Sequence, residues 1–195
     1  MTSRLVLTHG AGAGHQSDFL TQLRMELNAH QTCSVEPITF DYMKIQESNG
    51  KKRPPPRFPT LVTELEAHIK NTSDCVLAGK SMGSRVATQL TELPNIKGVV
   101  CYGFPFYPQG KPEKNRLSFL ENLAKPCLII QGTRDGLGNF DWVNQQTLNS
   151  KIQMHWIEGA DHDFKLLKKY QRSQQDVIAE LAKVTLAWLK QIAKQ

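Results

Sequence analysis

The stretch from Asp74 to Val86 places the narrowest limits on how this chain can fold. It reads D-C-V-L-A-G-K-S-M-G-S-R-V, so an apolar run ends at a glycine, a serine follows between two glycines, and a helix-capable segment comes next. Gly79 and Gly83 carry no side chain and therefore let a strand and a helix approach closely around a sharp turn. The stretch predicts a strand, a tight turn with Ser81 at its tip, and a helix.

The rest of the chain alternates between apolar runs and segments with helical spacing. We expect strands at residues 4–8, 35–42, 75–78, 96–102, 127–131 and 152–157, a helix soon after the first strand, and further helices at 60–70, 117–123, 141–148 and 173–193. Six strands alternating with helices predict an α/β three-layer sandwich with a mainly parallel sheet. A chain of 195 residues is expected to form a single domain, residues 1–195.

Composition argues against several classes of protein. No apolar stretch approaches the ~20 residues of a membrane span, and the amino terminus offers no leader, so we expect a cytoplasmic protein without membrane contact. The net charge of +6 favours anionic partners only weakly, and no stacking aromatics accompany the basic residues, so nucleic acid is not expected. The cysteines lack C-x-x-C spacing and are expected to be buried, reduced thiols: Cys33, Cys75, Cys101 and Cys127.

A serine, an acid and a histidine follow three of the expected strands. A serine hydroxyl becomes a good nucleophile only when a base takes its proton, and the base needs a third group to orient it. His162 follows the last expected strand and Asp135 follows the strand before it. The order Ser81, Asp135, His162 is that of α/β-hydrolases. Asp141 is a second candidate acid, less favoured because it does not directly follow a strand.

The glycine-rich loop H-G-A-G-A-G-H, residues 9–15, is a candidate oxyanion hole. Acyl transfer needs two backbone N–H groups for the tetrahedral oxyanion, one after the nucleophile and one from a loop after an earlier strand. We expect these groups from Met82 and Ala11, with Gly12 as the alternative to Ala11. His9, at the start of the loop, is expected to bond loop backbone instead of acting as a base.

Two phosphate-binding motifs fail on spacing. The loop has glycines at 10, 12 and 14, but a dinucleotide-binding loop needs its third glycine where His15 stands. The G-K-S ending of the serine turn resembles a P-loop, but the first glycine of that motif is replaced by Asp74. No cofactor is therefore expected. A metal is not expected either, because Asp161 and Asp163 beside His162 have no further clustered ligands.

The segment 47–59 contains G-K-K-R-P-P-P-R-F-P and is expected to be a proline-stiffened loop. It is either a solvated connection or a basic lip over the serine, because it leaves a strand at the same edge of a parallel sheet. The lip candidates are Arg53 and Arg57, with Lys52. Lys80 and Arg85 likewise either favour an anionic substrate or are paired surface charges.

Together the motifs resemble the α/β-hydrolase superfamily, in its small lidless dienelactone-hydrolase-like branch. More narrowly, H-G-A-G-A-G, K-K-R-P-P-P-R, G-K-S-M-G-S-R, G-T-R-D and G-A-D-H-D-F resemble a hydrolase-like family that includes testis-expressed protein 30 and a scaffold subunit of a histone acetyltransferase complex. This resemblance implies a minimal hydrolase fold without the first two strands or a lid domain. It also implies Ser81 as nucleophile, Asp135 as orienting acid and His162 as general base.

Two functions follow from this resemblance. The first is a serine hydrolase that cleaves a small carboxylic ester or thioester through an acyl-enzyme intermediate, with no cofactor. The second is a catalytically silent hydrolase-fold interaction or scaffold protein, because a fold by itself does not fix a function.

Overall fold

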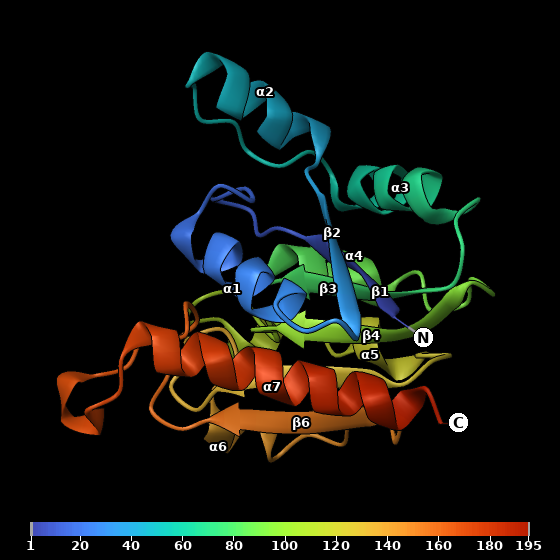
Figure 1. The fold of residues 1–195 in the computed structure, drawn as a ribbon. Helices are drawn as coiled ribbons and strands as arrows, with labels where there is room; N and C mark the ends of the chain where they lie inside the picture. Colours follow the sequence, from blue (N-terminus) through green and yellow to red (C-terminus); the bar gives the residue numbers. More distant parts are fainter. Residues whose placement is uncertain (1, 195) are drawn as a thin grey trace.

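The computed structural model of the chain describes residues 2–194 (Figure 1). In this part of the chain strands and helices alternate, with the bounds β1 Ser3–Thr8, α1 Asp18–Asn28, β2 Cys33–Ile38, α2 Asp41–Asn49, α3 Phe58–Ile69, β3 Cys75–Lys80, α4 Met82–Thr88, β4 Ile96–Tyr102, η1 Pro112–Lys114, α5 Ser118–Glu121, β5 Cys127–Gly132, α6 Phe140–Val143, β6 Ile152–Ile157, η2 Lys168–Tyr170 and α7 Gln174–Ile192.

The six strands form one sheet in the order β2-β1-β3-β4-β5-β6, and every neighbouring pair is parallel. The predicted six-stranded α/β sandwich is therefore confirmed, with a sheet that is parallel throughout. Because all strands run the same way, the loops that follow them emerge at one edge of the sheet. This carboxyl edge is where open α/β sheets bind ligands.

The sheet separates two apolar layers. Helices α1 and α7 cover one face, and α3 and α4 cover the other (Figure 1). Strand β1 shows how the sequence divides its side chains between them: Leu5 and Leu7 pack with the α1 and α7 layer, whereas Val6 packs with the α3 and α4 layer. This alternation follows from the two-residue period of a strand. Helix α2 stands apart from the sheet at the top of Figure 1.

The strand predicted at 35–42 was wrong at both ends, since β2 spans Cys33–Ile38 and α2 follows at once. The chain turns at Phe40, whose backbone N–H bonds the side chain of His9 and whose carbonyl accepts from the first turn of α2. The loop predicted at 47–59 is accordingly shorter. Helix α2 includes the first part of this segment and ends at Asn49, followed by Gly50 with a φ of 68°, and α3 begins at Phe58.

Helix α6 is also shorter than the helix predicted at 141–148. It spans Phe140–Val143, and the backbone N–H groups of Gln145 and Gln146 then bond carbonyls three residues back, not four. These tighter turns end the α-helix. The prediction for the cysteines is confirmed, because all four are buried free thiols and burial raises the pKa of Cys33 to about 11. Among residues 2–194, no helix is both long and apolar enough to cross a membrane.

Candidate active site

Ser81 occupies the single position between β3 and α4. Its backbone has φ 53° and ψ −111°, in a region that residues other than glycine rarely adopt. The two neighbouring glycines make the turn feasible: a Cβ on Gly79 would strike the backbone of Gly83, and a Cβ on Gly83 would strike Thr8 and the carbonyl of His9. The predicted tight turn is confirmed, and it holds Ser81 at the carboxyl edge of the sheet.

His162 bridges Ser81 and Asp135. Its Nε2 lies 2.9 Å from Oγ of Ser81, and its Nδ1 lies 2.8 Å from Oδ2 of Asp135. The carboxylate of Asp135 is fully buried and accepts a hydrogen bond from Nδ1–H, which leaves Nε2 free to accept from the serine hydroxyl. The fold thus brings together the three side chains singled out in the sequence, each from the loop that follows a different strand.

Two further groups fix Asp135. The side-chain amide of Gln131 donates to Oδ2 at 2.8 Å, and the backbone N–H of Leu137 donates to Oδ1 at 2.7 Å. Gln131 was not among the predicted site residues. A polar residue at the end of the apolar strand C-L-I-I-Q could have indicated its role. The other candidate acid, Asp141, is exposed on α6, so the structure distinguishes the two acids.

Hydrogen bonds to its carbonyl groups hold the glycine loop in place. His9 bonds the carbonyl of Gly10 through Nδ1 at 2.7 Å and accepts the N–H of Phe40 through Nε2 at 3.0 Å. Tyr42 donates to the carbonyl of Ala11 at 3.0 Å. Burial lowers the pKa of His9. Its Nε2 accepts the Phe40 N–H, which requires the neutral ring. The expected structural role of His9 is therefore confirmed.

These contacts orient the candidate oxyanion donors. In a trans peptide the N–H points away from the preceding carbonyl, so the N–H groups of Ala11 and Gly12 point away from His9 and Tyr42. Both residues line a hollow that also contains Ser81. Met82 is the first residue of α4, and the N–H groups of a first helical turn have no acceptor within the helix.

Lys80 is buried beside Ser81. The sequence allowed two interpretations of this lysine, a charge that favours an anionic substrate or a paired charge on the surface. Its Nζ donates to the backbone carbonyl of His162 at 2.7 Å and lies 3.9 Å from Oδ1 of Asp163. Burial lowers the pKa of Lys80. The lysine of G-K-S-M-G thus ties the histidine loop to the serine turn.

Asp161 shapes the same histidine loop. Its Oδ1 accepts the backbone N–H groups of Asp163 and Lys165, both at 2.9 Å. Within residues 2–194, no group of three or more His, Cys, Asp or Glu side chains is placed to hold a metal ion. His155 lies on β6 and bonds Glu180 of α7 at 3.1 Å, away from the serine.

Two hollows meet at Ser81. The larger hollow, about 1000 Å³, lies between the glycine loop, the start of α1 and the histidine loop. The smaller hollow, about 300 Å³, is lined by Pro55, Pro56, Met82, Arg85, Pro105 and Arg116, among others. Ser81 and Ala11 line both. The lip candidates Arg53 and Arg57 are exposed and line neither hollow. Two prolines between them, Pro55 and Pro56, line the smaller hollow.

Comparison with known families identifies the fold. Residues 1–190 match the family described as an alpha/beta hydrolase domain. The chain belongs to this α/β-hydrolase family. A comparison with curated proteins gave no match. The narrower resemblance to the family of testis-expressed protein 30 stays a prediction.

Solved structures of several hydrolases superpose over most of the chain. A dienelactone hydrolase from Anabaena variabilis has a TM-score of 0.67 at 17% identity, covering 97% of this chain and 86% of that one. A Pyrococcus furiosus esterase has a TM-score of 0.64 at 17% identity, covering 98% of this chain and 80% of that one. An alpha-beta serine hydrolase homologue from Coxiella burnetii has a TM-score of 0.63 at 18% identity, covering 97% of this chain and 86% of that one. The expected likeness to the small hydrolases is thus confirmed at the level of the fold.

Proposed function

We propose that this α/β-hydrolase-family protein is a serine hydrolase that cleaves a carboxylic ester or thioester through an acyl-enzyme intermediate. The observation that carries the proposal is the bridge made by His162, which bonds Ser81 through one ring nitrogen and buried Asp135 through the other. A base within hydrogen-bond reach of a serine, itself oriented by a carboxylate, is the arrangement that activates a hydroxyl.

The first half of the reaction forms the acyl-enzyme. Oγ of Ser81 attacks the carbonyl carbon while its proton passes to Nε2 of His162, and Asp135 stabilises the resulting imidazolium. The N–H groups of Met82 and Ala11, with Gly12 as the alternative to Ala11, bind the oxyanion. When the tetrahedral intermediate collapses, His162 returns the proton to the leaving oxygen or sulfur, and the acyl group stays on Ser81.

The second half releases the acid. A water molecule takes the place of the leaving group, His162 accepts one of its protons, and the hydroxide attacks the acyl carbonyl. A second tetrahedral intermediate forms at the same oxyanion donors. Its collapse returns the proton to Oγ of Ser81 and frees the carboxylic acid. None of these steps uses a cofactor.

A fluorophosphonate probe tests the proposal, because it reacts with activated serines. We expect the wild-type protein to be labelled and Ser81→Ala to remain unlabelled. Ser17→Ala is the matched control, since Ser17 lines the larger hollow but its hydroxyl bonds no histidine among residues 2–194. Equal labelling of wild type and Ser81→Ala would show that Ser81 is not the activated nucleophile. A wild type that is not labelled at all would favour a catalytically silent hydrolase fold.

A further inference from the structure

Two arginines line the smaller hollow without any acidic partner. Arg85 lies on α4, one helical turn after Ser81, and Arg116 lies between η1 and α5. Both side chains are half-buried, and neither forms a salt bridge within residues 2–194. None of the described side chains that line this hollow is acidic.

Arg85 is held by aromatic rings and not by an acceptor. Its guanidinium carbon lies 4.5 Å from the ring centre of Phe58 and 4.6 Å from that of Phe119. These cation–π contacts fix the group in place. Its Nε is buried and has no hydrogen-bond acceptor among the described residues. The guanidinium is therefore positioned, while its hydrogen-bonding capacity stays unused.

Arg116 also lines the hollow and is held by backbone carbonyl groups. Its Nη1 donates to the carbonyl of Pro105 at 3.1 Å, and its backbone N–H donates to Phe106 at 2.7 Å. Burial lowers the pKa of Arg116. Burial, and after it the positive charge of Arg116, lowers the pKa of Arg85 to about 10. Guanidinium groups in proteins stay protonated at neutral pH, so both arginines are charged.

Such an arrangement is unfavourable in the free protein. A half-buried charge costs free energy when no opposite charge compensates it, and here two like charges share one hollow. Groups that are unfavourable for the fold and line a cleft are typical of binding sites. The counter-charge that these arginines lack is an anion, and the planar fork of a guanidinium matches a carboxylate well.

The position of the hollow indicates which half of a substrate it receives. His162 must protonate the leaving group, so the leaving group lies on the side of His162. That side is the larger hollow, which His162 lines. The smaller hollow contains Ser81 and Met82 but not His162. In the proposed reaction, the acyl part of the substrate therefore extends into the smaller hollow.

We propose that Arg85 and Arg116 bind a carboxylate carried by the acyl part of the substrate, which makes the substrate a monoester or monothioester of a short dicarboxylic acid. This inference rests on the proposed hydrolase function. The hollow of about 300 Å³ suits an acyl chain of a few carbons. The released product is the free dicarboxylic acid.

Two nearly isosteric esters test the proposal. Monoethyl glutarate carries a carboxylate, and its half-amide, ethyl glutaramate, is neutral at the same position. Acid release in a pH-stat gives kcat/KM for each. We expect wild type to prefer the monoester by roughly tenfold or more, because hydrogen bonds between a guanidinium and a carboxylate are about twice as strong as those to a neutral amide. Arg85→Gln and Arg116→Gln are each expected to lower the ratio of the two kcat/KM values about tenfold.

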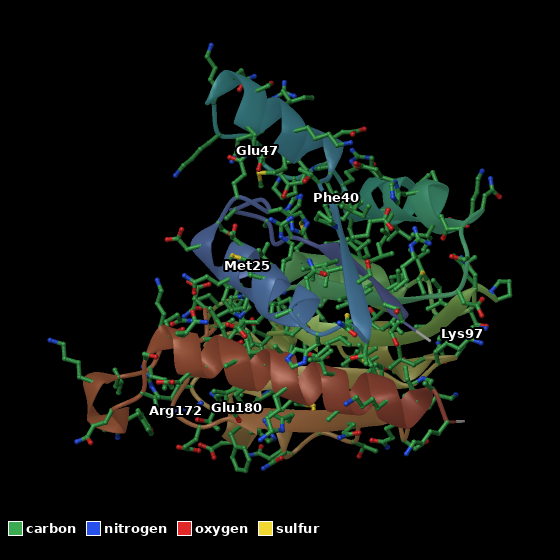
Figure 2. The ribbon with its side chains drawn as sticks, in the orientation of Figure 1. Met25, Phe40, Glu47, Lys97, Arg172 and Glu180 are labelled. Carbon is green, nitrogen blue, oxygen red and sulfur yellow. The ribbon has the colours of Figure 1, made fainter. Side chains whose placement is uncertain are left out.

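Matched variants distinguish the effect of these two arginines from the effect of losing a positive charge elsewhere on the protein. Lys97 (labelled in Figure 2) lies at the amino end of β4, whereas Ser81 follows the carboxyl end of β3. Lys97→Gln removes the same charge and should leave the ratio unchanged. Arg53→Gln removes a positive charge from the exposed loop before α3 and should likewise leave the ratio unchanged. An equal fall of the ratio in Lys97→Gln or Arg53→Gln would overturn the proposal. Arg85→Lys, which keeps the charge but not the fork, should fall between wild type and Arg85→Gln.

Binding to Ser81→Ala distinguishes failure of this inference from failure of the hydrolase proposal. Calorimetry should detect monoethyl glutarate but not ethyl glutaramate, and Arg85→Gln in the same background should abolish the difference. If wild type cleaves neither ester while this binding difference is present, the anion site stands and the proposed activity is wrong. If wild type cleaves both esters equally, or if Ser81→Ala binds neither, the anion site is wrong.

Discussion

Nε2 of His162 lies 2.9 Å from Oγ of Ser81, although 81 residues separate them along the chain. Their strands, β6 and β3, are not neighbours, because β4 and β5 lie between them. The histidine loop therefore crosses the end of β4. It passes Gly103, which has a φ of 68° and at which a Cβ would lie 3.5 Å from the ring of His162. A Cβ at that distance would make ordinary contact, so glycine is favoured at this crossing by its positive φ and not by a lack of space.

Asp135 should affect the rate of the proposed reaction far more than substrate binding. Asp135→Asn keeps the shape but removes the charge that orients His162 and stabilises its protonated form. We expect kcat for an activated ester such as 4-nitrophenyl acetate to fall about 10³- to 10⁴-fold with KM little changed. Steady-state kinetics measure both constants. Asp141→Asn, which alters the exposed acid on α6, should behave as wild type, and a similar loss in both variants would contradict the assignment.

Lys80 should act as a positioning residue through the carbonyl of His162. Lys80→Met keeps the apolar stem but removes the 2.7 Å hydrogen bond, so kcat for the same ester should fall about tenfold. The variant also removes a buried charge that is unfavourable for folding, so its free energy of unfolding in urea should not fall together with kcat. Lys165→Met, at an exposed lysine of the same loop, is the control. Unchanged kcat in Lys80→Met would show that the contact does not position the histidine.

Gly79 should tolerate no side chain. In Gly79→Ala the new Cβ would meet the backbone of Gly83 and Ser84, and backbone at a tight turn cannot move aside cheaply. We expect urea unfolding to show a loss of about 3 kcal/mol or more. Gly12→Ala is the matched substitution, because a Cβ there meets nothing within 4 Å. Equal stability of the two variants would mean that strand and helix are not packed as closely as described.

His15 should make the protein sensitive to mild acid. Its Nε2 bonds the carbonyl of Ile38 at 3.1 Å, its Nδ1 is buried without a partner among the described residues, and burial lowers its pKa from 6.5 to about 4. Between these values the unfolded chain binds a proton that the native state excludes, so stability falls as pH falls through this window. The loss is about 3 kcal/mol between pH 6.5 and pH 4.

Urea unfolding at several pH values measures this effect. His15→Gln keeps a donor for Ile38 but does not titrate, so its stability should vary less with pH than that of wild type. His30→Gln replaces an exposed histidine and should keep the slope of wild type. A wild-type slope in His15→Gln would show that other groups cause the acid sensitivity.

The sequence predicted the core of the candidate site because that site follows from strand order. Ser81, Asp135 and His162 each come soon after an apolar run, and parallel strands bring the loops at their carboxyl ends to one edge. The glycines around Ser81 similarly predicted the tight turn from local sterics alone. By contrast, the boundary of β2 was misplaced, since His9 decides where the chain turns at Phe40, and His9 lies 31 residues away.

What the sequence by itself determined was therefore the alternating fold, the serine turn and the identity of three side chains, all of which depend on local pattern and strand direction. Only the tertiary structure decided that Lys80 is buried against the histidine loop, that Gln131 holds Asp135, and that Arg85 and Arg116 share one hollow. These relationships join segments far apart in the chain. Their burial and pairing depend on how helices and loops pack against the sheet, which no local pattern encodes.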